Sequence, residues 1–273
     1  MRSRLGYIGL VSLVALSALG AASGMWKLIG ISWVAFGIMV VGGFISERSD
    51  TTHPMNLVWG YGLSGGAMVT SASIFLVSSA INHDPVYGGI GIASGIIGGY
   101  AGHNIRHRLA HVDLPVERTT AEISVHSVSA GVIIGIVYGN MPSLGPLLGL
   151  SIVSHKGPAG YAVAHRLREA DLPISALMLP ASGVGIAGII SGFLSLPNIP
   201  EVNGLVFGFA SGIFLHAAMD FLPPCETEGE IYEVAAARGK GHEYLDKLRD
   251  HALISTVIGG VVVLLARLVL GMG

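Results

Sequence analysis

The sequence predicts an all-helical integral membrane protein. Hydrophobic residues make up 51% of the chain and charged residues only 12%, which is too apolar for an ordinary soluble domain. The 40 glycines agree with this, because glycine is common where membrane helices pack closely. About nine apolar stretches follow one another, and most approach the roughly 20 residues that cross a hydrocarbon core of ~30 Å.

The first stretch has two interpretations. Its basic start and small-residue end resemble a signal peptide, but its apolar run is long for one. We therefore predict residues 1–26 as an extra N-terminal transmembrane helix, with a signal peptide as the alternative. The main transmembrane domain is predicted over residues 27–273. The nine stretches lie at about 5–24, 27–46, 56–81, 86–102, 120–140, 143–165, 173–196, 201–223 and 251–271.

Lysine and arginine residues predict the orientation. With the N-terminus in the cytoplasm, 12 of the 15 Lys and Arg residues fall on the cytoplasmic side. Lys27 and Arg267 fall outside, and Lys156 lies within a span. This asymmetry follows the positive-inside rule. It predicts a multi-pass protein of the cell membrane with a cytoplasmic N-terminus and a C-terminus outside. It also supports the fourth stretch, which is short and glycine-rich, because dropping it would invert every later span.

Composition excludes two other classes. The net charge of −2 gives no basic surface for nucleic acid. The single cysteine, Cys225, excludes an intrachain disulfide and a thiolate metal cluster. Hydrolase motifs such as HExxH and GxSxG are missing from the sequence, as is GxxxxGK[ST]. The sequence therefore predicts neither an enzyme nor a nucleotide-driven pump, and no prosthetic group.

Five ionisable residues lie deep in the predicted spans. They are His126 in the fifth stretch, His155 and Lys156 in the sixth, and His216 and Asp220 in the eighth. Such groups are costly in a membrane and are functional candidates by default. The third stretch adds a thioether at Met68.

Two consecutive spans carry related sequences, HSVSAG at 126–131 and HKGPAG at 155–160. Consecutive spans run in opposite directions, so this pair predicts an inverted repeat with a site at the midplane. Pro158 cannot donate a backbone hydrogen bond, and it frees a carbonyl about one turn earlier, a feature tolerated beside a cavity. A weaker match joins YGLSGGAM (61–68) to FGFASGIF (207–214), for which chance similarity of Gly/Ala-rich helices is an equal alternative.

Together these motifs resemble the ZIP (Zrt/Irt-like) metal-ion transporters over roughly 27–271. HSVSAG resembles the family's His-Asn-x-x-Glu-Gly, and HKGPAG its His/Gln-x-x-Pro-Glu-Gly. GGAM (65–68) and FASGIFLHAAMDFLPPCE (209–226) resemble further family helices. The resemblance implies eight ZIP-like transmembrane helices, with the extra helix before them. It also implies a metal site containing His126, His155 and Met68.

The chain departs from the family at its carboxylates. Ala130 and Ala159 stand where the family has glutamates, and Lys156 stands where a second-site ligand is common. A nearby ammonium opposes a second cation, so we expect the second metal site to be lost. One hypothesis is that Lys156 replaces the second metal ion electrostatically and pairs with Asp220. The alternative is that the Lys156 side chain extends to the membrane surface or into an aqueous vestibule.

The remaining ligands, two imidazoles and a thioether, suit Zn²⁺ or copper better than Mg²⁺ or Ca²⁺. We therefore expect divalent-metal transport, zinc by default, through alternating access. Predicted pathway residues are Lys156, His216, Asp220, Ser127 and Pro158. His103, His107 and His111 share a helical stripe and are candidates for metal capture, although interleaved arginines favour a lipid-contacting loop.

Two alternative functions stay open. The chain could be a non-transporting ZIP-like sensor or scaffold, or it could carry a non-metal or proton-coupled solute with Lys156. Partners would be the metal ion and the lipid bilayer, and the glycine-rich helices would also suit a homodimer.

Overall fold

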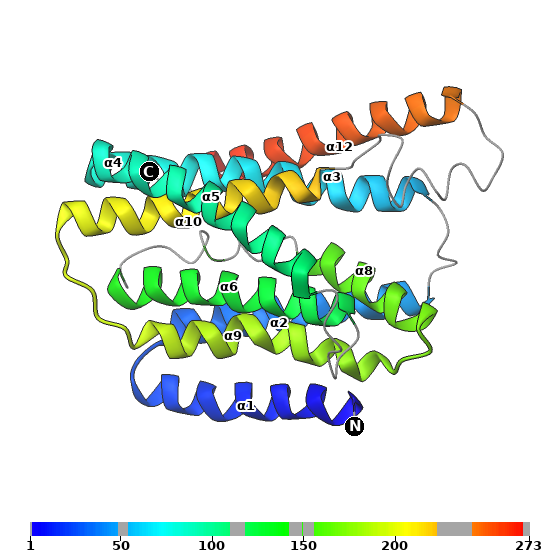
Figure 1. The fold of residues 1–273 in the computed structure, drawn as a ribbon, viewed down its shortest axis with the longest axis horizontal. Helices are drawn as coiled ribbons and strands as arrows, with labels where there is room; N and C mark the ends of the chain where they lie inside the picture. The colour runs from blue at the N-terminus through cyan, green and yellow to red at the C-terminus, as the bar shows by residue number, and fades with distance from the viewer. Residues whose placement is uncertain are drawn as a thin grey trace.

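The structure is a computed structural model that describes residues 2–48, 54–109, 118–141, 149, 156–222 and 242–269. Within these ranges every regular element is a helix (Figure 1). The helices are α1 (Arg2–Ala22), α2 (Trp26–Arg48), α3 (Pro54–Ser71), the π-helix η1 (Ala72–Val77), α4 (Ser78–His83), α5 (Pro85–Leu109), α6 (Arg118–Asn140), α8 (Lys156–Glu169), the 3-10 helix η2 (Ile174–Leu177), α9 (Met178–Gly192), α10 (Pro200–Phe221) and α12 (His242–Val269).

Six helical stretches in the described part are long and apolar enough to cross a membrane. They are Leu5–Ala22, Trp26–Arg48, Val58–His83, Ile174–Gly192, Pro200–Met219 and Tyr244–Val269. The protein is thus an all-α, multi-pass membrane protein, as the sequence predicts.

The predicted count of nine spans is not reached, for three local reasons. Helix α5 is long, but its many glycines contribute little hydropathy. The apolar part of α6 covers only Ser124–Asn140. Helix α8 has 14 residues, and most of the preceding part of its predicted span lies outside the described residues.

Two sharp chain reversals have identifiable local causes. Gly24 follows α1 with a positive φ of 75°, a conformation that side chains disfavour, and this lets the chain turn directly into α2. At the start of α5, the Asp84 carboxylate accepts hydrogen bonds from the backbone N–H groups of Val86 and Tyr87. Pro85 occupies the first helical position, where no backbone donor is needed. Both reversals therefore place consecutive helices side by side.

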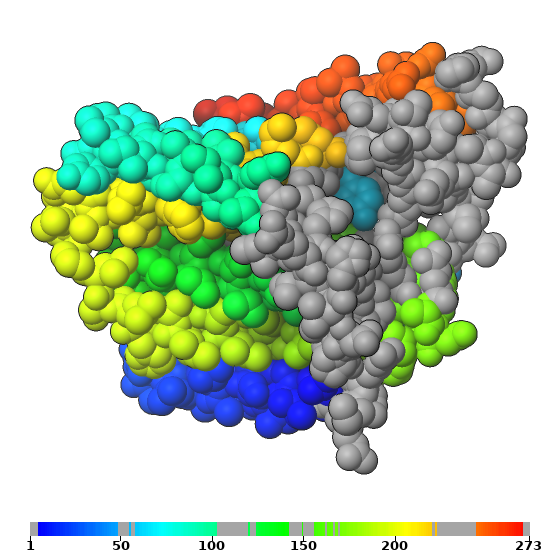
Figure 2. All heavy atoms as spheres, viewed as in Figure 1, coloured from blue at the N-terminus to red at the C-terminus, as the bar shows by residue number. Residues whose placement is uncertain are grey.

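The main helices form two groups. The first group contains α2, α6, α8 and α9; the second contains α3, α5, α10 and α12. Within the groups the closest pairs are α2 with α8, α6 with α9, α3 with α12, and α5 with α10. The principal contacts between the groups are α3 with α8 and α6 with α10, and within the second group α3 also contacts α10. Helix α1 packs on α9 at one edge of the molecule, and α12 forms the opposite edge (Figure 2).

Glycine allows each of the four closest pairs to approach at backbone distance. A Cβ atom at these positions would collide with a backbone carbonyl of the neighbouring helix, so the site requires glycine. One such contact from each pair is Gly160 against Met39, Gly135 against Gly188, Gly66 against Thr256, and Gly95 against Phe209. The glycine content noted in the sequence therefore serves helix packing.

Several hydroxyl groups inside the apolar helices are satisfied locally, although the buried hydroxyls of Ser46 and Ser71 have no partner among the described residues. The Ser32 hydroxyl donates to the Leu28 carbonyl at 2.7 Å, and the Ser124 hydroxyl donates to the Thr120 carbonyl at 2.6 Å. Such bonds to the carbonyl one turn earlier remove the cost of a polar group in hydrocarbon.

Candidate functional site

The predicted site residues lie on helices that meet around the boundary between the two groups. Met68 is on α3, His126 and Ser127 are on α6, Lys156 and Pro158 are on α8, and His216 is on α10. These four helices contact one another in a ring, α3 to α8 to α6 to α10 and back to α3. The fold thus gathers elements from distant parts of the sequence, as a midplane site requires.

Met68 and Ala130 belong to one buried cluster of the core. Their side chains are 1% and 4% exposed, respectively. His126 precedes Ala130 by one helical turn and is half-buried. Ala159 on α8 is also buried. Alanine methyls are therefore enclosed at both positions where the ZIP resemblance expects a glutamate.

Lys156 is among the largest fully buried side chains of the described residues. It is 1% exposed, and its Nζ atom donates a hydrogen bond of 3.1 Å to the Oγ atom of Ser127, which is 0% exposed. This bond joins α8 to α6. Lys156 forms no ion pair with any described residue. A neutral hydroxyl is therefore the polar partner of a buried amine that carries a full charge when protonated.

Several predicted residues lie wholly or partly outside the described structure. His155 and His111 are outside the described residues. The backbones of His103 and His107 lie in α5, and that of Asp220 lies in α10, but their side chains are not described. The loop metal site and the pairing of Lys156 with Asp220 remain predictions.

The residues that can be assessed do not form a metal cluster by themselves. No group of three His, Cys, Asp or Glu side chains able to hold a metal ion occurs within the described part of the chain. The predicted ligand set differs from such a group, because it includes the thioether of Met68 and His155, which lies outside the described residues. Met68, His126 and Lys156 lie on three helices of the ring described above.

His216 occupies a pocket formed by a neighbouring glycine. A Cβ atom at Gly99 of α5 would lie 2.6 Å from the His216 ring, so the ring fills the space that glycine leaves. Its Nε2 atom is buried and has no hydrogen-bond partner among the described residues. An imidazole nitrogen left in this state is able to hold an ion, a water or a proton.

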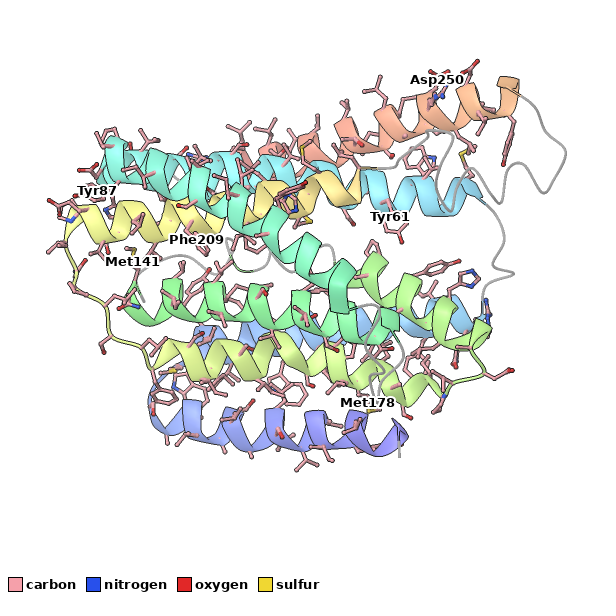
Figure 3. All side chains as sticks on the ribbon, viewed as in Figure 1. Tyr61, Tyr87, Met141, Met178, Phe209 and Asp250 are labelled. Atoms are coloured by element: carbon pink, nitrogen blue, oxygen red, sulfur yellow. The ribbon has the colours of Figure 1, made fainter. Side chains whose placement is uncertain are left out.

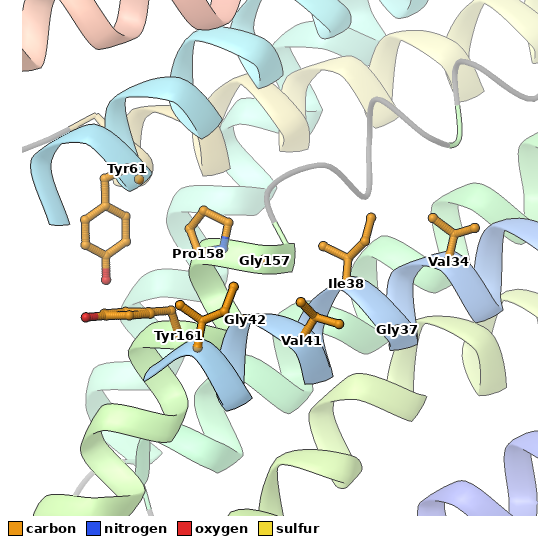
Figure 4. A pocket seen from close by; sticks show the side chains of 11 residues that line it. Val34, Gly37, Ile38, Val41, Gly42, Tyr61, Gly157, Pro158 and Tyr161 are labelled. Atoms are coloured by element: carbon orange, nitrogen blue, oxygen red, sulfur yellow. The ribbon is translucent and has the colours of Figure 1, made fainter. Parts of the chain in front are cut away.

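Pro158 lines an apolar groove at the boundary of the two groups. The groove has a volume of about 770 Å³, and its other lining residues come from α2, α3 and α8. Tyr61 points from α3 toward the first group (Figure 3) and lies opposite Pro158 and Tyr161 (Figure 4). The two helix groups are thus separated here by space rather than by packed side chains.

Sequence reasoning missed both tyrosines of this groove. Tyr61 opens the YGLSGGAM segment, and Tyr161 follows directly after HKGPAG, so each lies beside a motif that was singled out. The sequence feature that could have indicated them is a tyrosine directly beside glycine in each of these two apolar stretches. It also missed the link from α3 to α12, where Trp59 Nε1 donates to His251 Nδ1 at 3.2 Å.

Comparison of the chain with protein-family models and with curated proteins gives no match. The resemblance to ZIP transporters therefore stands on the residues quoted above.

Proposed function

We propose that this membrane protein transports divalent metal ions, with zinc as the default substrate. His126, His155 and Met68 bind one ion near the midplane, and Lys156 occupies the neighbourhood of a lost second site. The observation that carries the proposal is the ring of α3, α6, α8 and α10, because it collects the helices that bear Met68, His126 and Lys156.

The pattern of helix contacts supports an inverted repeat. The principal contacts are preserved when α2 is exchanged with α9, α3 with α10, α5 with α12, and α6 with α8. The exchange turns the pair α2 with α8 into the pair α9 with α6, and it turns the pair α3 with α12 into the pair α10 with α5. The sequence matches follow the same exchange, since HSVSAG and HKGPAG belong to α6 and α8, and the weaker match joins α3 to α10. Agreement between contacts and sequence argues against chance similarity.

Eight spans plus the N-terminal helix α1 complete the proposed architecture. Helices α5, α6 and α8 are the three that fall short by length or hydropathy, and all three pack against long apolar helices of their own group. Burial of α8 among other helices lowers its need for an apolar surface, and the exposed face of α5 carries apolar side chains such as Ile90 and Ile97. The proposed N-terminus is cytoplasmic, as the charge distribution predicts, and a homodimer is compatible with this arrangement.

Movement of one group against the other is the proposed route to alternating access. Contacts are rich within each group, whereas the principal contacts across the boundary are confined to α3 with α8 and α6 with α10. The groove beside Tyr61 and Pro158 lies on the same boundary. Transporters of this kind expose a fixed site to either side by rocking or sliding one bundle.

A non-transporting, ZIP-like membrane protein is the second candidate. It is favoured by the buried methyl groups of Ala130 and Ala159, which offer no charge to a divalent ion. A sensor or scaffold would tolerate that loss, and a transporter must compensate for it.

Metal uptake distinguishes the two candidates. Purified protein in liposomes containing a metal indicator is offered Zn²⁺, Fe²⁺, Mn²⁺, Co²⁺ or Cd²⁺. We expect uptake by the unaltered protein and its loss in the His126→Ala/His155→Ala variant. Protein that folds correctly and moves none of these ions would establish the second candidate.

A further inference from the structure

We propose that the apolar groove between α2, α3 and α8 binds an anionic phospholipid of the surrounding bilayer. The described residues that line the groove are apolar apart from the hydroxyl groups of its two tyrosines. On the α2 side, Val34, Val41 and Ile45 line the groove and are also exposed at the surface of the molecule. In a protein that spans the membrane, such a surface faces lipid tails, so the groove is accessible from the bilayer.

The groove has the length of one lipid leaflet. Along α2 it extends from Val34 to Ile45, and a rise of about 1.5 Å per residue makes this distance about 16 Å. Half of a hydrocarbon core of ~30 Å is about 15 Å. Ile45 lies one turn before the end of α2 at Arg48, so one end of the groove lies near a membrane surface and the other near the bilayer centre. An acyl chain of one leaflet therefore fits along it.

Glycine and tyrosine shape the groove for such a chain (Figure 4). A Cβ atom at Gly37 would meet no other atom within 4 Å, so this part of the groove holds space. Tyr61 and Tyr161 lie at the end of the groove opposite Val34, which is the end near the membrane surface. Tyrosine is enriched at this depth, because its ring contacts lipid tails while its hydroxyl reaches the polar head groups.

The face of α2 that lines the groove ends in a positive charge. The lining positions 34, 38, 41 and 45 follow the helical period. The next position of this stripe is Arg48, an exposed residue in the last turn of α2. Glu47 lies on the opposite face of the helix, two residues after Ile45. The apolar stripe of α2 thus leads to a guanidinium group at the membrane surface.

The face of α8 that lines the groove leads to basic residues as well. Tyr161 lines the groove, and His165 and Arg168 follow it on the same face at the helical spacing. The Arg168 guanidinium donates a hydrogen bond of 3.3 Å to the Ser46 carbonyl of α2. Because Ser46 directly follows Ile45, this bond places the exposed Arg168 side chain beside the end of the groove.

An apolar channel that ends in two guanidinium groups is complementary to an anionic phospholipid. The acyl chain fills the apolar part, and the phosphate accepts hydrogen bonds from Arg48 and Arg168, since guanidinium binds phosphate through paired N–H groups. In the predicted orientation this end faces the cytoplasm, where anionic lipids give the leaflet a negative surface potential. Basic pockets between membrane helices on that side bind such head groups. The lipid site does not depend on the proposed transport function.

Lipid retention by the purified full-length protein tests the inference. Native mass spectrometry is recorded in non-ionic detergent after addition of equal amounts of phosphatidylglycerol and phosphatidylcholine with the same acyl chains. We expect one phosphatidylglycerol per chain, retained about fivefold or more over phosphatidylcholine, because each basic residue near the head group adds to the affinity for an anionic lipid.

Two substitutions separate the acyl chain from the head group. Gly37→Trp fills the groove and should remove both lipids, whereas Gly30→Trp is the matched control, because Gly30 has equally open surroundings on α2 but does not line the groove. Arg48→Gln/Arg168→Gln should lower phosphatidylglycerol to the level of phosphatidylcholine. Its control, Lys247→Gln/Arg249→Gln, removes two exposed charges of α12 and should keep the preference.

The site is excluded if the unaltered protein retains neither lipid, or if Gly37→Trp retains as much as the unaltered protein. A dimer without lipid that Gly37→Trp dissociates would show that a second copy fills the groove, which also overturns the inference. Equal retention of both lipids by the unaltered protein would contradict the anionic head group. If Gly37→Trp does not fold, the arginine variant decides: loss of the preference supports the site, and an unchanged preference overturns it. Lipid retention without any metal uptake would contradict the transport function and leave the lipid site standing.

Discussion

The Nζ atom of Lys156 lies 3.1 Å from the Oγ atom of Ser127, and this hydrogen bond joins α8 to α6 in the interior of the membrane bundle. Among the described residues the polar partner of this amine is a neutral hydroxyl, and burying a charged amine is costly unless it is compensated. The pair lies directly beside the two predicted histidine ligands in the sequence, His126 and His155. We therefore expect Lys156 to contribute to the electrostatics of the proposed metal site.

Replacing Lys156 by methionine should strengthen zinc binding in chloride-free buffer by about tenfold, because it removes a unit positive charge near the ion. Isothermal titration calorimetry on the purified protein measures the change. Lys247→Met carries the same substitution on the exposed surface of α12 and should leave the affinity as it was. Equal affinities for unaltered protein and Lys156→Met would show that the ammonium does not act on the bound ion.

Gly42→Leu should destabilise the protein by about 1–3 kcal/mol or prevent its folding, because any side chain there collides with the Gly157 carbonyl of α8. Gly30→Leu is the matched control on the same helix, since a Cβ atom at Gly30 meets nothing within 4 Å. Thermal unfolding in detergent compares the two. Equal loss of stability in both variants would contradict the close approach of α2 and α8.

A disulfide across the boundary of the helix groups should stop transport. A Cβ atom at Gly60 of α3 would lie 4.0 Å from the Pro158 Cβ atom of α8, which is within the range of a disulfide. With Cys225 replaced by serine, the Gly60→Cys/Pro158→Cys variant should lose zinc uptake on oxidation and regain it on reduction. Each single-cysteine variant controls for the substitutions themselves. Full uptake in the oxidised, cross-linked protein would rule out relative movement of α3 and α8.

Trp59→Phe should lower the free energy of unfolding by about 1 kcal/mol, because it removes the hydrogen bond to His251 that links α3 to α12. The comparison is Trp26→Phe, at an exposed position of α2. Denaturant unfolding in mixed micelles gives both values. A change no larger than that of Trp26→Phe would mean that water or detergent replaces this bond without loss.

The helical nature of the membrane domain could be predicted from the sequence, because apolar length is a strong signal in lipid. The number of membrane spans was harder to predict from apolar length alone. Glycine lowers the hydropathy of α5 while improving its packing on α10, so the property that stabilises this helix also weakens its signal. The start of α12 at His242, before the predicted apolar stretch at 251, reflects a polar first part that packs on α3 through Leu245 and Leu248.

The site was predicted in part. Burial of Lys156 and Met68 follows from their place in apolar stretches, and the structure agrees. The partner of Lys156 could not be predicted, because Ser127 lies on another helix and many other serines were available. The groove at Tyr61 depends on how two helix groups meet, and sequence periodicity holds no information about that contact.

Zinc K-edge X-ray absorption on the zinc-loaded protein tests most directly whether His126, His155 and Met68 hold the ion. Chloride-free buffer is needed, because chloride scatters much as sulfur does. The account predicts imidazole nitrogens at about 2.0 Å and one thioether sulfur at a distance longer than the roughly 2.3 Å of a zinc–thiolate bond, with the sulfur lost in Met68→Leu and the imidazoles lost in His126→Ala/His155→Ala. An oxygen-only coordination shell, or a spectrum that these substitutions leave unchanged, would contradict it.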